Sequence, residues 1–230
     1  MEKYYEVLKK NELFKNIEKN DLMALLSCLS PRIREYKKNE VIGLNGENLD
    51  NLGIVVRGKV EIAKEDADGN KNIVAMINEG EMFGETAVFS GFNKYPVNVF
   101  SHADSTVLFI SPDKMIGRCD QNCIFHEQLI KNILSVIAKK ALMLNRKLEY
   151  GSIKSMRGKI SKYIVEQYKK NGEVSEFEMS MNRNELADFL NVSRPSMSRE
   201  FGKMRDEGII EYKRKIIIIK NLELLERQVP

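Results

Sequence analysis

Short apolar runs alternate with turn-forming residues over the first half of the chain. From about residue 32 to residue 110 the runs are rich in β-branched and aromatic residues, as in LGIVVRGKVEIAKE, KNIVAMI and STVLFI. Clusters of Asn, Asp and Gly separate them, and Asp68-Gly69 is a typical hairpin turn between two such runs. Many short strands at regular spacing predict a barrel or a sandwich. Residues 1–26 instead have helical periodicity and predict short helices.

A single long helix is predicted from residue 120 to residue 150. No Pro or Gly interrupts this stretch, and apolar residues recur at intervals of four and three. Such an a/d stripe is typical of a coiled coil, so we expect it to form a parallel dimer interface. Packing of the stripe within one chain is the alternative. The predicted dimer residues are Ile130, Leu134, Ile137, Ala141, Leu144 and Leu148.

The segment MNRNELADFLNVSRPSMSREFGKMRDEGII predicts a helix-turn-helix. Asn182 suits the N-cap of its first helix, with a glutamate three residues later at the spacing of a capping box. Asn191 stands where the turn needs left-handed backbone. Ser193 suits the N-cap of the second helix, and the proline in the first turn lacks a donor that would have no intrahelical partner anyway.

The second helix, residues 193–204, is expected to enter the major groove of DNA. Met197, Phe201 and Met204 are spaced to face the core, which leaves a polar and basic face outward. Arginine suits bidentate contact with guanine, and two strands with a basic tip then complete a winged motif. A helical hairpin with a solvated basic face is the alternative. The predicted DNA contacts are Asn182, Arg183, Ser193, Arg194, Ser196, Arg199, Lys203, Lys213, Arg214 and Lys215.

The charge distribution points the same way. The net charge is +4, and residues 151–230 hold 16 Lys and Arg against 12 Asp and Glu, while the preceding residues balance. A polyanionic partner is therefore favoured at the C-terminal end. No apolar run is long enough to predict a membrane span, and the apolar core of a signal peptide is absent. We therefore expect a cytoplasmic protein. No metal site is predicted: Cys119 and Cys123 are four residues apart and could form a thiol pair or half of a metal site, but two small, partly buried side chains are the favoured interpretation.

Taken together, these motifs resemble those of the CRP/FNR family of bacterial transcription regulators. The likeness rests on LGIVVRGKVEI, on GEMFGETAVFSG, on the long helix and on NELADFLNVSRPSMSREFGKMRDEGII. It implies an α+β protein with a β-roll of the double-stranded β-helix or jelly-roll type. The implied domains are residues 1–118 for the cyclic-nucleotide-binding-like effector domain, 119–150 for the dimerisation helix and 151–230 for the winged helix-turn-helix. Implied partners are an operator in double-stranded DNA, a second copy of the chain and RNA polymerase.

The resemblance also implies an effector site, where this sequence departs from members that bind cyclic AMP. Gly84 and Glu85 match the residues that hold the phosphate and the ribose in those members. The Arg-Ser pair that anchors the phosphate is replaced by Tyr95-Pro96, so a buried phosphate would lose a charge-assisted bond. We therefore expect a small effector other than cyclic AMP. The expected effector residues are Phe83, Gly84, Glu85, Thr86, Ala87, Tyr95, Pro96, Val97, Leu144 and Asn145.

The identity of the effector stays open at the level of sequence. A haem that senses nitric oxide or CO is one alternative, with His126 as its candidate axial ligand. A redox switch at Cys119 and Cys123 is another, and an unidentified, mostly apolar ligand or no ligand are the others. A cyclic-nucleotide-binding signalling module without a DNA role predicts a retained phosphate arginine and no winged basic helix, the reverse of this sequence. No catalytic triad or phosphate loop stands out, so we do not expect an enzyme.

Overall fold

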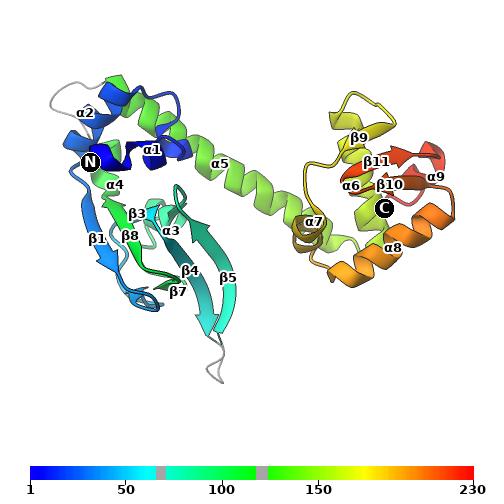
Figure 1. The fold of residues 1–230 in the computed structure, drawn as a ribbon, viewed down its shortest axis with the longest axis horizontal. Helices are drawn as coiled ribbons and strands as arrows, with labels where there is room; N and C mark the ends of the chain where they lie inside the picture. The colour runs from blue at the N-terminus through cyan, green and yellow to red at the C-terminus, as the bar shows by residue number, and fades with distance from the viewer. Residues whose placement is uncertain (66–70, 118–123) are drawn as a thin grey trace. The chain divides into compact units, whose positions relative to one another are not determined.

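The computed structural model describes residues 1–65, 71–117 and 124–230 of the chain. These residues form two compact units, 1–139 and 140–230 (Figure 1). Each unit has its own apolar core. The long helix α5, Ile124–Ser152, runs through the boundary and contributes to both units. Within the described residues, no helix is long and apolar enough to cross a membrane.

Two antiparallel four-stranded sheets build the N-terminal unit, which confirms the predicted β-roll. The strand orders are β1-β8-β3-β6 and β2-β7-β4-β5, so β1 and β2 each lie at the edge of a sheet. The strands are β1 (Arg32–Tyr36), β2 (Val41–Gly43), β3 (Leu52–Arg57), β4 (Lys59–Glu65), β5 (Lys71–Asn78), β6 (Met82–Phe83), β7 (Asn98–Ser101) and β8 (Ser105–Ile110).

Helices cover one face of the first sheet. They are two 3₁₀ turns, Glu2–Tyr4 and Glu12–Phe14, with α1 (Tyr5–Leu8), α2 (Lys19–Leu29) and α4 (Pro112–Ile116), while α3 (Glu85–Phe89) follows β6. Strand β3 is buried on both faces, because Leu52, Ile54 and Val56 meet the helices while Val55 faces the interior of the roll. A strand covered on both sides has a continuous apolar sequence, as in LGIVV.

The first half of α5 is fixed to this unit. Leu129 and Ile133 are buried in the same cluster as the N-terminal helices. The side-chain amide of Asn132 donates to the carbonyl oxygens of Leu13 and Lys15 at 2.9 and 2.8 Å. These contacts fix one face of the first half of α5 against the N-terminal helices. The opposite face of this half is exposed.

The C-terminal unit packs helices on a small antiparallel sheet of order β10-β11-β9. Its core combines aromatic and aliphatic side chains from every helix of the unit, including Tyr163, Phe189 and Phe201. This arrangement confirms the predicted winged helix-turn-helix. The elements are α6 (Met156–Lys170), β9 (Glu176–Glu178), α7 (Arg183–Leu190), α8 (Arg194–Asp206), β10 (Ile210–Lys213), β11 (Ile216–Ile219) and α9 (Leu222–Glu226).

Candidate nucleic-acid interface and effector site

The turn between α7 and α8 forms through the local signals of its sequence. The side chain of Asn182 accepts from the backbone of Asn184 and Glu185, and Glu185 accepts from the backbone of Asn182, which completes a capping box. Asn191 ends α7 in left-handed backbone with φ of 52°. Ser193 caps α8 by accepting from the backbone of Ser196 at 3.3 Å. The caps therefore set where each helix begins and ends.

Helix α8 divides into a buried face and a basic exposed face. Met197, Phe201 and Met204 are fully buried. Arg194, Arg199 and Lys203 are exposed and Ser196 is half-buried. The guanidinium of Arg199 donates to the hydroxyl of Ser196 at 2.9 Å, so this arginine is already oriented near the start of the helix. A helix of this kind can present side chains to base edges in a major groove.

The predicted contact Arg183 has partners inside the protein. Its guanidinium lies 3.5 Å from the ring centroid of Phe201 and 4.8 Å from that of Tyr212. Its Nη1 is buried, and burial lowers the pKa of the guanidinium. Arg183 therefore joins α7, α8 and the first wing strand β10 through cation–π contacts. Nothing in the sequence indicated this role, because the two rings lie far along the chain.

The tip of the wing carries the predicted cations. Lys213, Arg214 and Lys215 are all exposed at the turn between β10 and β11. Arg214 has a positive φ of 55°, which reverses the chain within that turn. The three side chains are accessible to a phosphate backbone, which is the partner that short basic clusters suit.

An ion-pair network that the sequence did not predict holds α8 against α6. Arg157 Nε lies 2.6 Å from Glu200 Oε1, and its terminal nitrogens bind both oxygens of Glu207 at 2.6 and 2.7 Å. These hydrogen bonds raise the pKa of Arg157. Glu200 on α8 thereby helps to orient that helix against α6. A bidentate arginine of this kind adds geometric specificity as well as energy.

The predicted dimer stripe on α5 is largely exposed in the single chain. Leu134, Leu144 and Leu148 keep 61%, 59% and 65% of their surface accessible, and Ala141 is also exposed. Ile130 and Ile137 are half-buried, and Ile137 packs against the N-terminal core. Several large apolar side chains along one helix are therefore uncovered by any described residue of this chain.

The predicted effector residues 83–87 lie at the tight turn between β6 and α3. Gly84 is the N-cap of α3 and has φ of 83°, a conformation that favours glycine. Phe83, Glu85 and Ala87 are buried, and the hydroxyl of Thr86 donates to Glu85 Oε1 at 3.1 Å. Pro96 is exposed and Val97 is half-buried. Leu144 and Asn145 are exposed on α5 within the second unit.

Tyr95, in place of the family's phosphate arginine, is buried and packs across β2. A Cβ built on Gly43 would lie 2.3 Å from its ring, so the tyrosine occupies space that only a glycine leaves free. Burial raises the pKa of Tyr95 to about 12, and neighbouring carboxylates add to the shift. The hydroxyl therefore stays protonated at neutral pH and offers a hydrogen-bond donor in place of a positive charge.

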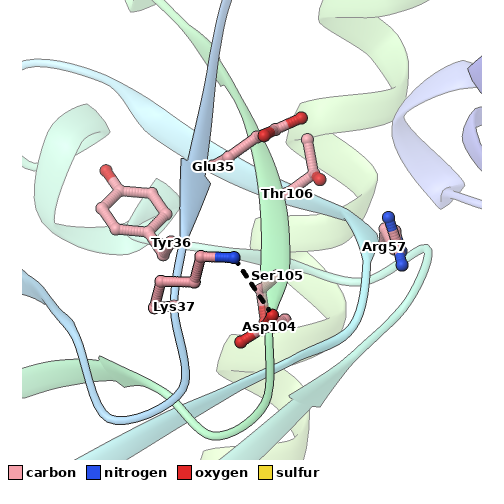
Figure 2. Close-up of a pocket in the computed structure, with 7 residues that line it drawn as sticks. All are labelled: Glu35, Tyr36, Lys37, Arg57, Asp104, Ser105 and Thr106. Atoms are coloured by element: carbon pink, nitrogen blue, oxygen red, sulfur yellow. Dashed lines mark hydrogen bonds and ion pairs between the residues drawn. The ribbon is translucent and has the colours of Figure 1, made fainter.

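Two cavities lie beside strand β1. One of about 230 Å³ is lined by Tyr95, Tyr36 and the arginines Arg32 and Arg34, among others. The other, of about 260 Å³, lies between the end of β1 and the start of β8. Figure 2 shows Lys37 and Asp104 in it, and the Lys37 ammonium lies 3.5 Å from the Asp104 carboxylate. Among the predicted effector residues, Tyr95 lines the first cavity and none lines the second.

His126, the candidate haem ligand, is buried. Its Nε2 lies 3.2 Å from the carbonyl oxygen of Lys114, and its Nδ1 is buried. A haem ligand needs a ring nitrogen that can reach iron, so this geometry favours a packing role for the side chain. Cys119 and Cys123 lie outside the described residues. Cys28 is half-buried.

Comparison with known proteins accounts for both units. Residues 33–122 match the model of the cyclic nucleotide-binding domain, and residues 158–228 match that of the Crp-like helix-turn-helix domain. The chain belongs to the CRP/FNR family. It is a DNA-binding transcription regulator of this type, with a cyclic-nucleotide-binding sensor domain. Its relatives are transcription regulators and not enzymes.

Relatives cover nearly the whole chain at low identity. A CRP-like cAMP-activated global transcriptional regulator of Mycobacterium tuberculosis is 22% identical over 97% of this chain and 98% of its own length. The anaerobic regulatory protein of Bacillus subtilis is 22% identical over 83% and 80%. The catabolite activator protein of Thermus thermophilus has a TM-score of 0.53 at 20% identity, covering 95% of this chain and 98% of its own. The fold is thus shared, and the low identity leaves the residues around an effector free to differ.

Proposed function

We propose that the protein acts as a homodimer that reads an operator in double-stranded DNA through the outer face of helix α8. The observation that carries this proposal is the division of α8 into a fully buried Met197-Phe201-Met204 face and an exposed basic face. Two copies related by a two-fold axis would present their α8 helices to successive major grooves. Recruitment of RNA polymerase and action in the cytoplasm follow as proposals from the relatives' activity.

Replacement of the α8 arginines tests this proposal. Arg194→Ala and Arg199→Ala should each cost about 1–3 kcal/mol of operator binding and relax base preference, because each removes a bidentate donor. The measurement is affinity for an operator selected from random duplexes with the parent protein. Arg227→Ala, which removes an exposed cation directly after α9, is the matched control. Parent-like affinity and base preference in both α8 variants would contradict the proposed recognition face.

The exposed stripe on α5 supports the dimer. Leu144→Glu combined with Leu148→Glu should convert the protein to a monomer, because two charges would have to be buried in the coiled coil. Light scattering after size exclusion measures the mass. Ser135→Glu, on the exposed surface of α5 away from the stripe, is the control. A double variant that remains dimeric would place the interface elsewhere.

We further propose that the sensor domain responds to a ligand other than cyclic AMP. The support is the replacement of a phosphate-binding cation by the buried, protonated Tyr95. Cyclic AMP at micromolar concentration should leave the melting temperature and the operator affinity unchanged. A clear rise in either quantity would show that the roll supplies the missing charge from another residue.

A further inference from the structure

The cavity of about 230 Å³ that Tyr95 lines opens at the edge of the roll. It lies between β1 and the loop of residues 44–51, where the edge strands of the two sheets meet without a shared ladder. Its apolar part includes Tyr36, Tyr95 and Phe109, and the rings of Tyr36 and Phe109 form an edge contact with centroids 6.5 Å apart. The volume is below the range of about 300–1,000 Å³ usual for drug-sized ligands, so a smaller molecule fits.

The walls of this cavity carry opposite charges. Arg32 and Arg34 come from β1 and share a face of the strand with Tyr36, because side chains alternate along a strand. Glu47 and Asp50 come from the loop on the other side. No ion pair within 4 Å joins either arginine to a carboxylate among the described residues.

The neighbouring cavity shows the contrast. There Lys37 and Asp104 already pair across the space, as the dashed line in Figure 2 marks. In the first cavity the exposed side chains of both signs line a shared space without pairing across it, although Arg34 also donates toward Tyr36. One carboxylate is partly used, since Glu47 Oε2 accepts from the backbone of Leu44 at 2.9 Å.

Two tyrosines with largely buried side chains, Tyr36 and Tyr95, line the same cavity. Burial is the first cause of the raised pKa of Tyr95, followed by Tyr36 and Glu47, while Arg34 opposes the shift and Asp50 adds to it. Burial also raises the pKa of Tyr36, against a hydrogen bond from Arg34. Both hydroxyls therefore stay protonated at neutral pH, so each retains a hydrogen that it can donate.

We propose that this cavity binds a small zwitterion of the amino-acid type with an apolar side chain. Its carboxylate is received by Arg32 and Arg34, its ammonium group by Asp50 and the free oxygen of Glu47, and its side chain by the rings of the floor. A simple anion would meet the carboxylates of the loop, and a simple cation would meet the arginines. A ligand with both charges satisfies both walls. Binding at this cavity does not depend on the DNA-binding function.

Titration calorimetry on the full chain tests the proposal with matched probes. L-phenylalanine and L-leucine are the zwitterions, 3-phenylpropanoate lacks the ammonium group, and 2-phenylethylamine lacks the carboxylate. At least one zwitterion should bind, and L-phenylalanine should bind about tenfold or more tightly than either single-charge analogue, because each analogue leaves one wall unsatisfied. Absence of heat for both amino acids at millimolar concentration, or equal affinity for an analogue, would overturn the proposal.

Variants locate the binding. Arg34→Gln and Asp50→Asn should each weaken the tighter amino acid by about tenfold, while Arg57→Gln, at the cavity of Figure 2, should leave its affinity unchanged. Melting curves of each variant verify the fold. Parent-like affinity in both cavity variants would overturn the assignment. Operator affinity of the same samples without amino acid reports separately on the proposed DNA function.

Discussion

The two units differ in how their candidate sites are assembled. In the C-terminal unit one helix supplies the exposed face proposed to read bases, and its caps and buried residues lie within a short stretch of chain. In the N-terminal unit the residues around Tyr95 come from β1, β2, β8 and the loops before β3 and β7. The first site depends on local periodicity, and the second depends on which distant segments meet. The contrast explains why the sequence allowed candidate DNA contacts to be named while it left the effector open.

The largest expected effect tests whether the units are stabilised separately. Phe201→Ala should lower the free energy of unfolding of the C-terminal unit by about 3–5 kcal/mol, because a fully buried aromatic side chain leaves a cavity. Hydrogen exchange resolved by peptide should show faster exchange in residues 156–226. Protection of the β-roll strands should remain at the parent level. Equal loss of protection in both units would break the comparison.

A smaller effect separates orientation from direct contact at Arg183. Arg183→Met should weaken operator binding by about 0.5–2 kcal/mol, through loss of the cation–π contacts that join α8 to the wing. Because the cation is stacked on Phe201 and Tyr212, the dependence of affinity on salt concentration should keep its slope. Removal of a phosphate contact would instead reduce that slope by about one. Lys213→Met, at the exposed wing tip, is the comparison that should reduce it.

The smallest effect concerns the pH dependence of the roll. Tyr95 has an ordinary pKa near 10 when unfolded and about 12 when folded, so the folded state retains the proton longer. The contribution of the protonated Tyr95 to the free energy of unfolding is therefore complete below pH 10 and is lost as the pH rises from 10 toward 12. Tyr95→Phe should therefore reduce the loss of stability between pH 10 and 11 by about 1 kcal/mol. Urea unfolding at the two pH values measures it, and an unchanged slope would mean that Tyr95 is solvated.

The local features of the helix-turn-helix were predictable. The Asn182 capping box, the left-handed Asn191 and the Ser193 cap each involve residues within one turn of one another, and the structure confirms all three. Their energies depend on neighbours along the chain. The burial of Met197, Phe201 and Met204 followed from helical spacing and is also confirmed.

Contacts between distant residues were not predictable. Arg183 is a cation at the start of the helix-turn-helix, as a DNA contact would be. Its stacking on Phe201 and Tyr212 depends on how the wing packs against α7 and α8. The pairing of Arg157 with Glu200 and Glu207 likewise needed two helices to pack together. In the roll, the sequence indicated that Tyr95 replaces a phosphate cation. It did not indicate that Arg34 and Asp50 would line the same cavity.

The sequence alone determined the class of protein, the order of its parts and the buried and exposed faces of α8, because these follow from periodicity and capping over a few residues. The tertiary structure decided which charges are paired and which are left facing a cavity. The fold of the roll brings β1 and the loop of residues 44–51 to the same cavity, and the sequence alone does not contain the distance between them. Electrostatic chemistry depends on that distance and on burial, which only the folded chain provides.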